Sequence, residues 1–114
     1  MLQISQSMMD KFEAEAAHRA VCWHQERLLA RFPSLSTTPA AQRYEFAHRN
    51  RLSAIRLGIS DEEDIATFLD CAVMYGEDFS GEPWASDILD LEELSGADRA
   101  QLLREAIADI GVTL

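Results

Sequence analysis

Residues 57–89 read LGISDEEDIATFLDCAVMYGEDFSGEPWASDIL, and this stretch decides the predicted fold. Gly58 followed by the apolar Ile59 is a common way to end a helix, because a left-handed glycine lets the chain turn back over the last carbonyls. Ser60 and Glu63 stand at capping-box spacing, where each side chain can accept a hydrogen bond from the other residue's backbone N–H. We therefore expect two helices joined by a tight turn at Gly58.

The residues after this turn have the pattern of a packed helix that ends at Gly76. Its apolar side chains recur three or four positions apart and form one stripe: Ile65, Phe68, Leu69, Ala72 and Val73. In the following loop, Phe79 is the one large apolar residue, and we expect it to fold back onto the helices. Pro83 suits the first turn of a further short helix, since proline lacks the N–H that is unpaired there. That helix carries Trp84, Ile88, Leu89 and Leu91.

A long helix is expected near the start of the chain. Ser5 is its predicted N-cap, and it ends near Arg31 because Pro33 biases the preceding residue towards an extended conformation. Its predicted apolar stripe consists of Met9, Phe12, Ala16, Ala20 and Trp23, widened by Met8, Val21, Leu28 and Phe32.

The remaining segments complete an all-α prediction. Residues 34–38 are polar and predict a loop, after which Thr38 and Pro39 fit the N-cap and first position of the helix that ends at Gly58. The last helix opens around residues 95–98, and its stripe is Leu102, Leu103, Ala106, Ile107 and Ile110. No segment shows the alternating pattern of a strand. We predict a single domain, residues 1–114, built as a compact irregular bundle of four to five helices.

Composition indicates an ordinary globular chain. Apolar residues make up 47% and charged residues 26% of the sequence. No apolar run approaches the ~20 residues of a membrane span, and the first residues lack the plan of a signal peptide, so we expect a cytoplasmic protein that does not enter a membrane. Cys22 and Cys71 are too few for a disulfide framework and are expected to stay reduced.

Charge is divided unevenly along the sequence. Residues 1–57 hold eight basic and five acidic side chains, residues 58–114 hold two basic and fifteen acidic ones, and the formal net charge is −10. Nucleic acid is not expected as a partner, because phosphate binding needs clustered Lys and Arg. The acidic half can keep the chain soluble or can steer a partner with a complementary surface.

The sequence offers few residues for chemistry. His18 and Cys22 lie four residues apart on one helix, but a metal site needs three or four ligands and His24 points elsewhere. His48 has no nucleophile placed beside it, and the carboxylates of residues 61–64 are favoured by the N–H groups at a helix start. We expect no catalytic residue, no metal, no cofactor and no enzymatic activity. An alternative hypothesis is a small metal-dependent enzyme that uses His18 and Cys22 together with a further ligand.

Aromatic residues are the candidates for recognition of another protein. Trp23, Tyr75, Phe79 and Trp84 can each belong to the core or to a binding surface, and Trp84 is the better candidate for the surface because it follows a loop. The residues we assign to partner binding are Tyr75, Phe79, Trp84, Arg49 and Arg56.

Landmarks along nearly the whole chain form a recognisable order. They are Gly58-Ile59, Glu62 or Glu63, Asp64, Phe68, Gly76, Phe79, Pro83-Trp84 and Leu89, preceded by MLQIS, Met9, Phe12 and Arg31-Phe32-Pro33. This order resembles small helical proteins encoded in bacterial type VI secretion effector operons, near the spike, adaptor and toxin genes. The chain departs from them in having Leu57 where an aromatic often precedes the glycine, and in a more acidic loop before Pro83.

The resemblance implies an accessory role in the cytoplasm. The expected function is that of a co-chaperone or adaptor that holds a secreted effector, its chaperone or a spike component before loading. The alternative is an immunity protein that inhibits a cognate toxin by binding it. Both hypotheses require another protein as partner, and a homo-oligomer stays open.

Overall fold

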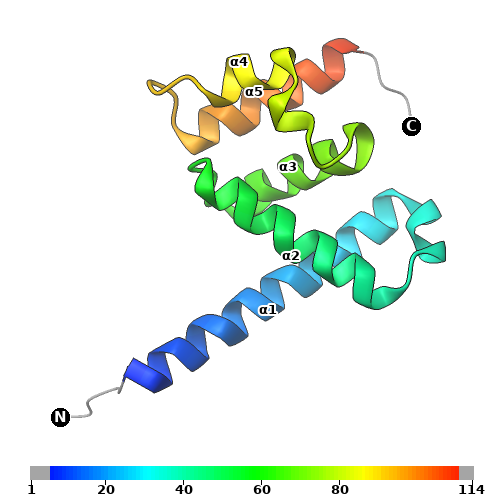
Figure 1. The fold of residues 1–114 in the computed structure, drawn as a ribbon, viewed down its shortest axis with the longest axis vertical. Helices are drawn as coiled ribbons and strands as arrows, with labels where there is room; N and C mark the ends of the chain where they lie inside the picture. Colours follow the sequence, from blue (N-terminus) through cyan, green and yellow to red (C-terminus); the bar gives the residue numbers. More distant parts are fainter. Residues whose placement is uncertain (1–5, 111–114) are drawn as a thin grey trace. The chain divides into compact units, whose positions relative to one another are not determined.

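Helices make up all of the regular structure in residues 6–110, the part of the 114-residue chain that the computed structural model describes, with side chains up to residue 108. The elements in order are α1 (Gln6–Arg31), η1 (Pro33–Thr37), α2 (Ala40–Arg56), α3 (Glu62–Tyr75), η2 (Phe79–Gly81), α4 (Pro83–Leu89) and α5 (Gly96–Ile110), where η denotes a short 3-10 helix (Figure 1). The predicted all-α bundle of four to five helices is confirmed. Within the described residues, no helix has the length and apolar character needed to cross a membrane.

The chain is organised as two compact units whose boundary falls inside α2, between Tyr44 and Glu45. The first unit contains α1, η1 and residues 40–44 of α2, and the second contains residues 45–56 of α2 and everything that follows. The single domain expected over residues 1–114 stays a prediction.

In the first unit the chain reverses after α1 through a structured turn. The sequence predicts a loop over residues 34–38, but residues Pro33–Thr37 form η1, in which the Leu35 N–H donates to the Phe32 carbonyl (2.9 Å). Proline at the first position explains the difference, because its fixed φ suits a helical turn and its missing N–H has no role there. α2 then begins at Ala40, one residue later than predicted. The proposed cap Ser5 lies outside the described residues.

The apolar stripe predicted for α1 does not face a core. Met9, Phe12 and Trp23 are 46%, 58% and 43% exposed, whereas the buried residues of α1 are Val21, His24 and Leu28. α1 carries apolar residues on two sides, and spacing alone does not tell which side becomes covered. Val21 and Leu28, expected only to widen the stripe, belong to the buried side.

In the second unit, the turn between α2 and α3 has the predicted glycine stop. Gly58 has φ +83°, its N–H donates to the Ile55 carbonyl, and the Ile59 N–H donates to the Ala54 carbonyl, both at 3.0 Å. These two bonds satisfy the last carbonyls of α2, and the Ile59 side chain is fully buried. Sequence and structure therefore agree on how α2 ends.

The predicted capping box at Ser60 is wrong by one residue. Asp61 is the N-cap of α3, and its carboxylate accepts from the backbone N–H of Glu63 (2.9 Å) and of Asp64 (3.4 Å). An ionised carboxylate is a stronger acceptor than a hydroxyl and is also favoured by the positive end of the helix dipole. Ser60 is exposed beside it.

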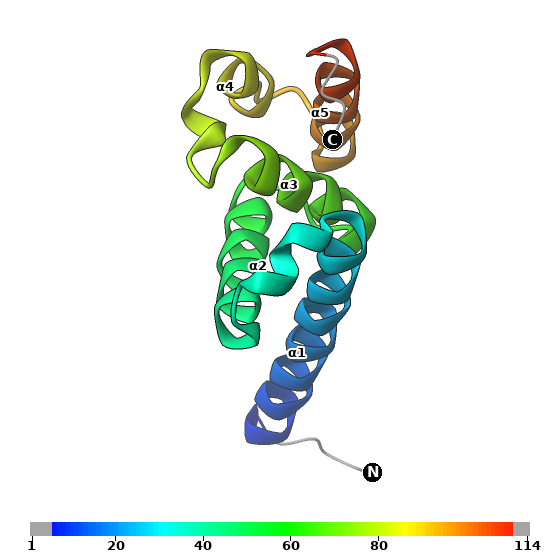
Figure 2. The ribbon, with the colours of Figure 1, turned by 90° about the vertical axis from the view of Figure 1, so that its right-hand side faces the viewer.

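α3 is the central element of the second unit. Its residues 65–72 are all buried, and it packs against α5 and η2, with α4 against α5 (Figure 2). Phe79 folds into this core as predicted, with 1% exposure, while Leu91 lies beyond the end of α4 and is 44% exposed.

The start of α5 is held directly against the α2–α3 turn. A Cβ atom built on Gly96 would lie 2.0 Å from the Gly58 carbonyl oxygen, so only glycine fits there. Arg99 donates to the carbonyls of Leu57 (2.5 Å) and Leu91 (2.7 Å), joining two loops to α5. Arg104 pairs with Asp64 of α3 at 2.7 Å. These contacts hold α5 against α3 and against the turn between α2 and α3.

Candidate partner-binding surface

Three of the five residues assigned to partner binding meet where α3 passes into α4. α3 ends at Tyr75, and Gly76, with φ +97°, reverses the chain into η2. The Trp84 ring lies 5.2 Å from the Tyr75 ring, edge to face, and 6.0 Å from the Phe79 ring, stacked. We call Tyr75, Phe79 and Trp84 the aromatic corner.

Burial decreases from Phe79 to the outer residues Tyr75 and Trp84. Phe79 lies against Phe68, with ring centroids 4.9 Å apart, and both are 1% exposed. Tyr75 and Trp84 are half-buried. Phe79 is therefore a core residue that supports Trp84 from behind, and the surface available to a partner consists of parts of Tyr75 and Trp84. Sequence spacing left this division open.

The Tyr75 hydroxyl is covered and has no hydrogen-bond partner among the residues that the structure describes. Burial, with a smaller contribution from the neighbouring Cys71, raises the pKa of Tyr75 above its usual value. The phenol consequently stays protonated at neutral pH and keeps one O–H donor.

A polar group adjoins the aromatic corner. Glu77 accepts from Arg49 Nε (2.8 Å) and from Asn50 Nδ2 (2.9 Å), and Asn50 also donates to the Phe46 carbonyl (2.8 Å). The hydrogen bond from Arg49, joined by that from Asn50, holds the pKa of Glu77 below its usual value, and the same contact raises the pKa of Arg49. Arg49 is thus already paired within the chain.

Arg56 is not part of this group. It is exposed in the last turn of α2, roughly 10 Å along the helix axis from Arg49 at 1.5 Å per residue. Glu77 and Asn50 are not predictable as members of this group, because the Arg49–Glu77 and Asn50–Glu77 pairs are 28 and 27 residues apart along the chain and no local pattern links them.

The other residues considered for chemistry are spread over both units. His18 lies 3.5 Å from the Cys22 sulfur and 2.8 Å from the Tyr44 hydroxyl. His48 is half-buried in α2, and the carboxylate of Glu62 pairs with Arg51 at 2.6 Å. Among the side chains that the structure describes, residues 6–108, no group of three or more His, Cys, Asp or Glu is placed to hold a metal ion.

No protein-family model, curated protein or solved structure matches this chain.

Proposed function

We propose that this chain is a non-enzymatic, cytoplasmic accessory protein that binds another protein, as a co-chaperone or adaptor for a type VI secretion effector or its chaperone. The observation that carries the proposal is the exposed apolar side of α1. Met8, Met9, Phe12 and Trp23 are 50%, 46%, 58% and 43% exposed. They fall within roughly 100° of one another around the helix, since each residue advances about 100°.

Within the part of the chain that the structure describes, the first half of α1 is exposed on all of its sides. Every residue from 6 to 16 is exposed, although the helix continues through this region. A helical segment of this length is marginally stable in water unless an apolar face is covered. Exposed apolar patches rimmed by charged residues are common at sites of protein interaction. A partner that covers this half of α1 would remove Met8, Met9 and Phe12 from water.

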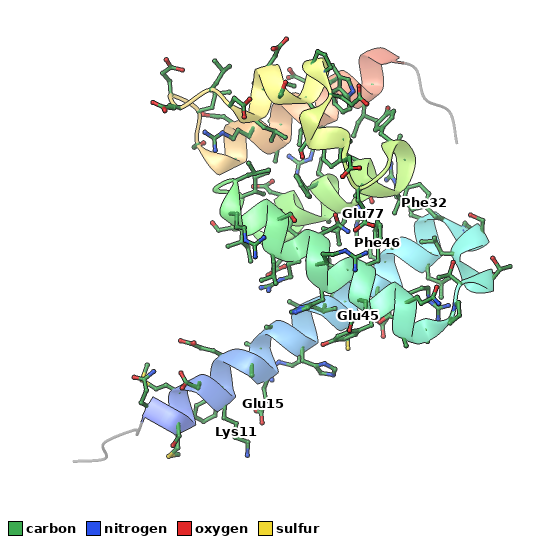
Figure 3. All side chains as sticks on the ribbon, viewed as in Figure 1. Lys11, Glu15, Phe32, Glu45, Phe46 and Glu77 are labelled. Atoms are coloured by element: carbon green, nitrogen blue, oxygen red, sulfur yellow. The ribbon has the colours of Figure 1, made fainter. Side chains whose placement is uncertain are left out.

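Charged residues lie at the edge of this side of α1 and within it, and they would orient a partner. Lys11 and Glu15 lie one turn apart on the same side of the helix (Figure 3), and Arg19 follows one turn later. Alternating charges beside an apolar stripe favour one register of an approaching helix over others.

The aromatic corner, with Tyr75 and Trp84, is a second predicted contact surface.

Co-purification of the full chain with the products of neighbouring genes tests the proposal. Wild-type protein is expected to retain an effector, its chaperone or a spike component, and Phe12→Glu to lose it. Ala14→Glu is the matched control, because it adds the same charge to an exposed position on a different side of α1. Failure of the wild type to retain any of these proteins, or equal retention by Phe12→Glu, would contradict the proposal.

An immunity protein is the second candidate, favoured by the acidic surface between α4 and α5. Its exposed carboxylates are Asp87, Asp90, Glu92, Glu93 and Asp98. Such a surface can cover a basic active site of a toxin. Co-expression distinguishes the two functions: an immunity protein restores growth of cells that express the toxin, whereas an adaptor changes only secretion.

A further inference from the structure

Three side chains of the first unit form a hydrogen-bonded line that the proposed function does not use. The Tyr44 hydroxyl lies 2.8 Å from His18 Nδ1, and the Cys22 sulfur lies 3.5 Å from His18 Nε2. The two rings are 5.4 Å apart between centroids. His18 and Cys22 are one helical turn apart on α1, while η1 reverses the chain and brings Tyr44 of α2 to them.

This order of groups suits proton transfer from the thiol. A thiolate, and not a thiol, is the nucleophilic form of cysteine, and an adjacent imidazole generates it by accepting the proton. After transfer, Nε2–H of the imidazolium would donate to the Cys22 sulfur and Nδ1–H would donate to the Tyr44 oxygen. Both charged partners would then be hydrogen-bonded, and Tyr44 acts as the residue that positions the ring.

The two cysteines of the chain differ in their exposure to solvent. Cys22 is half-buried and His18 is exposed, whereas Cys71 is fully buried with 0% exposure. A small reagent from solution can therefore reach the sulfur that has a base beside it.

The same pair is two ligands short of a four-coordinate metal site, and no further His, Cys, Asp or Glu within the described residues completes one.

We propose that Cys22 is a site of reversible modification by small-molecule disulfides, with His18 as the base. The Cys22 proton passes to His18 Nε2, and the thiolate attacks one sulfur of the disulfide. The S–S bond of the reagent breaks as the new S–S bond to Cys22 forms. The leaving sulfur departs as a thiolate and takes the proton back from His18. One disulfide is consumed and one mixed disulfide is formed, so no further oxidant is needed.

The reaction of the full chain with 4,4′-dithiodipyridine at neutral pH tests this site, followed by release of the pyridinethione and by peptide mass analysis. We expect one label at Cys22, with Cys71 unmodified in the folded protein. His18→Gln is expected to slow labelling about tenfold or more, because the variant lacks the base that accepts the thiol proton. Oxidised glutathione is expected to give the same mixed disulfide at Cys22.

Two further readouts separate a base from a packing role. Added imidazole is expected to restore labelling in His18→Ala more than it accelerates the wild type. Tyr44→Phe is expected to shift the ring-nitrogen NMR signals of His18, because Nδ1 loses its partner. Equal labelling rates in wild type and His18→Gln, absence of rescue by imidazole, or labelling first at Cys71 would overturn the proposal.

Discussion

At the scale of single residues, Gly96 is a position that cannot accept a side chain without a shift of the backbone. A side chain there would meet the backbone of the α2–α3 turn, which has no flexible end that could move aside. We expect Gly96→Ala to lower the free energy of unfolding by about 2–4 kcal/mol. Urea denaturation measures it, and Gly81→Ala is the control, since nothing lies within 4 Å of its Cβ position and its φ is ordinary. Equal losses in the two variants would contradict the close approach.

Glu77 gives a prediction about pH. Its pKa in the folded chain lies below the usual 4.5, so its carboxylate stabilises the fold at neutral pH, and this contribution falls as pH drops below about 5 and through the folded pKa. Glu77→Gln should therefore destabilise the protein more at pH 7 than at pH 3. The effect is small because both side chains of the Arg49–Glu77 pair are about half exposed to solvent. A difference between variants that grows on acidification would be inconsistent with the contacts described.

At the scale of elements, local sequence signals locate the end of α2 and place the start of α3 to within one residue. The glycine stop at Gly58 was predicted because its bonds join residues within five positions. The cap of α3 was missed by one residue because a serine and an aspartate stand side by side and both fit the pattern. The covered side of α1 was missed because packing, and not spacing, decides it.

The cap of α3 can be tested directly. Asp61→Ala should lower the free energy of unfolding by about 1 kcal/mol, because two backbone N–H groups at the helix start lose their acceptor. Ser60→Ala should have almost no effect. Thermal or urea unfolding measures the stability of the two variants. A larger loss in Ser60→Ala than in Asp61→Ala would support the capping box predicted at Ser60 instead.

At the scale of the whole molecule, each unit contains one of the two tryptophans, Trp23 in α1 and Trp84 in α4. If residues 1–114 form one cooperative domain, as the sequence predicts, unfolding followed by either tryptophan should have the same midpoint. Trp23→Phe and Trp84→Phe isolate the two signals, with circular dichroism of each variant as the reference. Separate midpoints within a single variant, one by fluorescence and one by circular dichroism, would indicate independent domains.

The aromatic corner shows how far a binding surface could be read from sequence. Tyr75, Phe79 and Trp84 were identified together because they fall within ten residues, but only the fold assigns Phe79 to the core and leaves Trp84 half-buried. Arg49 was identified without Glu77, since the helices that bring them together are distant in sequence.

The exposed apolar side of α1 is the proposed binding site for another protein. The most direct measurement is the affinity of the co-purified partner for wild-type, Phe12→Glu and Ala14→Glu chains, by calorimetric titration at equal ionic strength. We expect Phe12→Glu to weaken binding by at least about tenfold, the cost of losing one buried aromatic contact, and Ala14→Glu to bind as the wild type does. Equal affinity of all three chains would contradict the account.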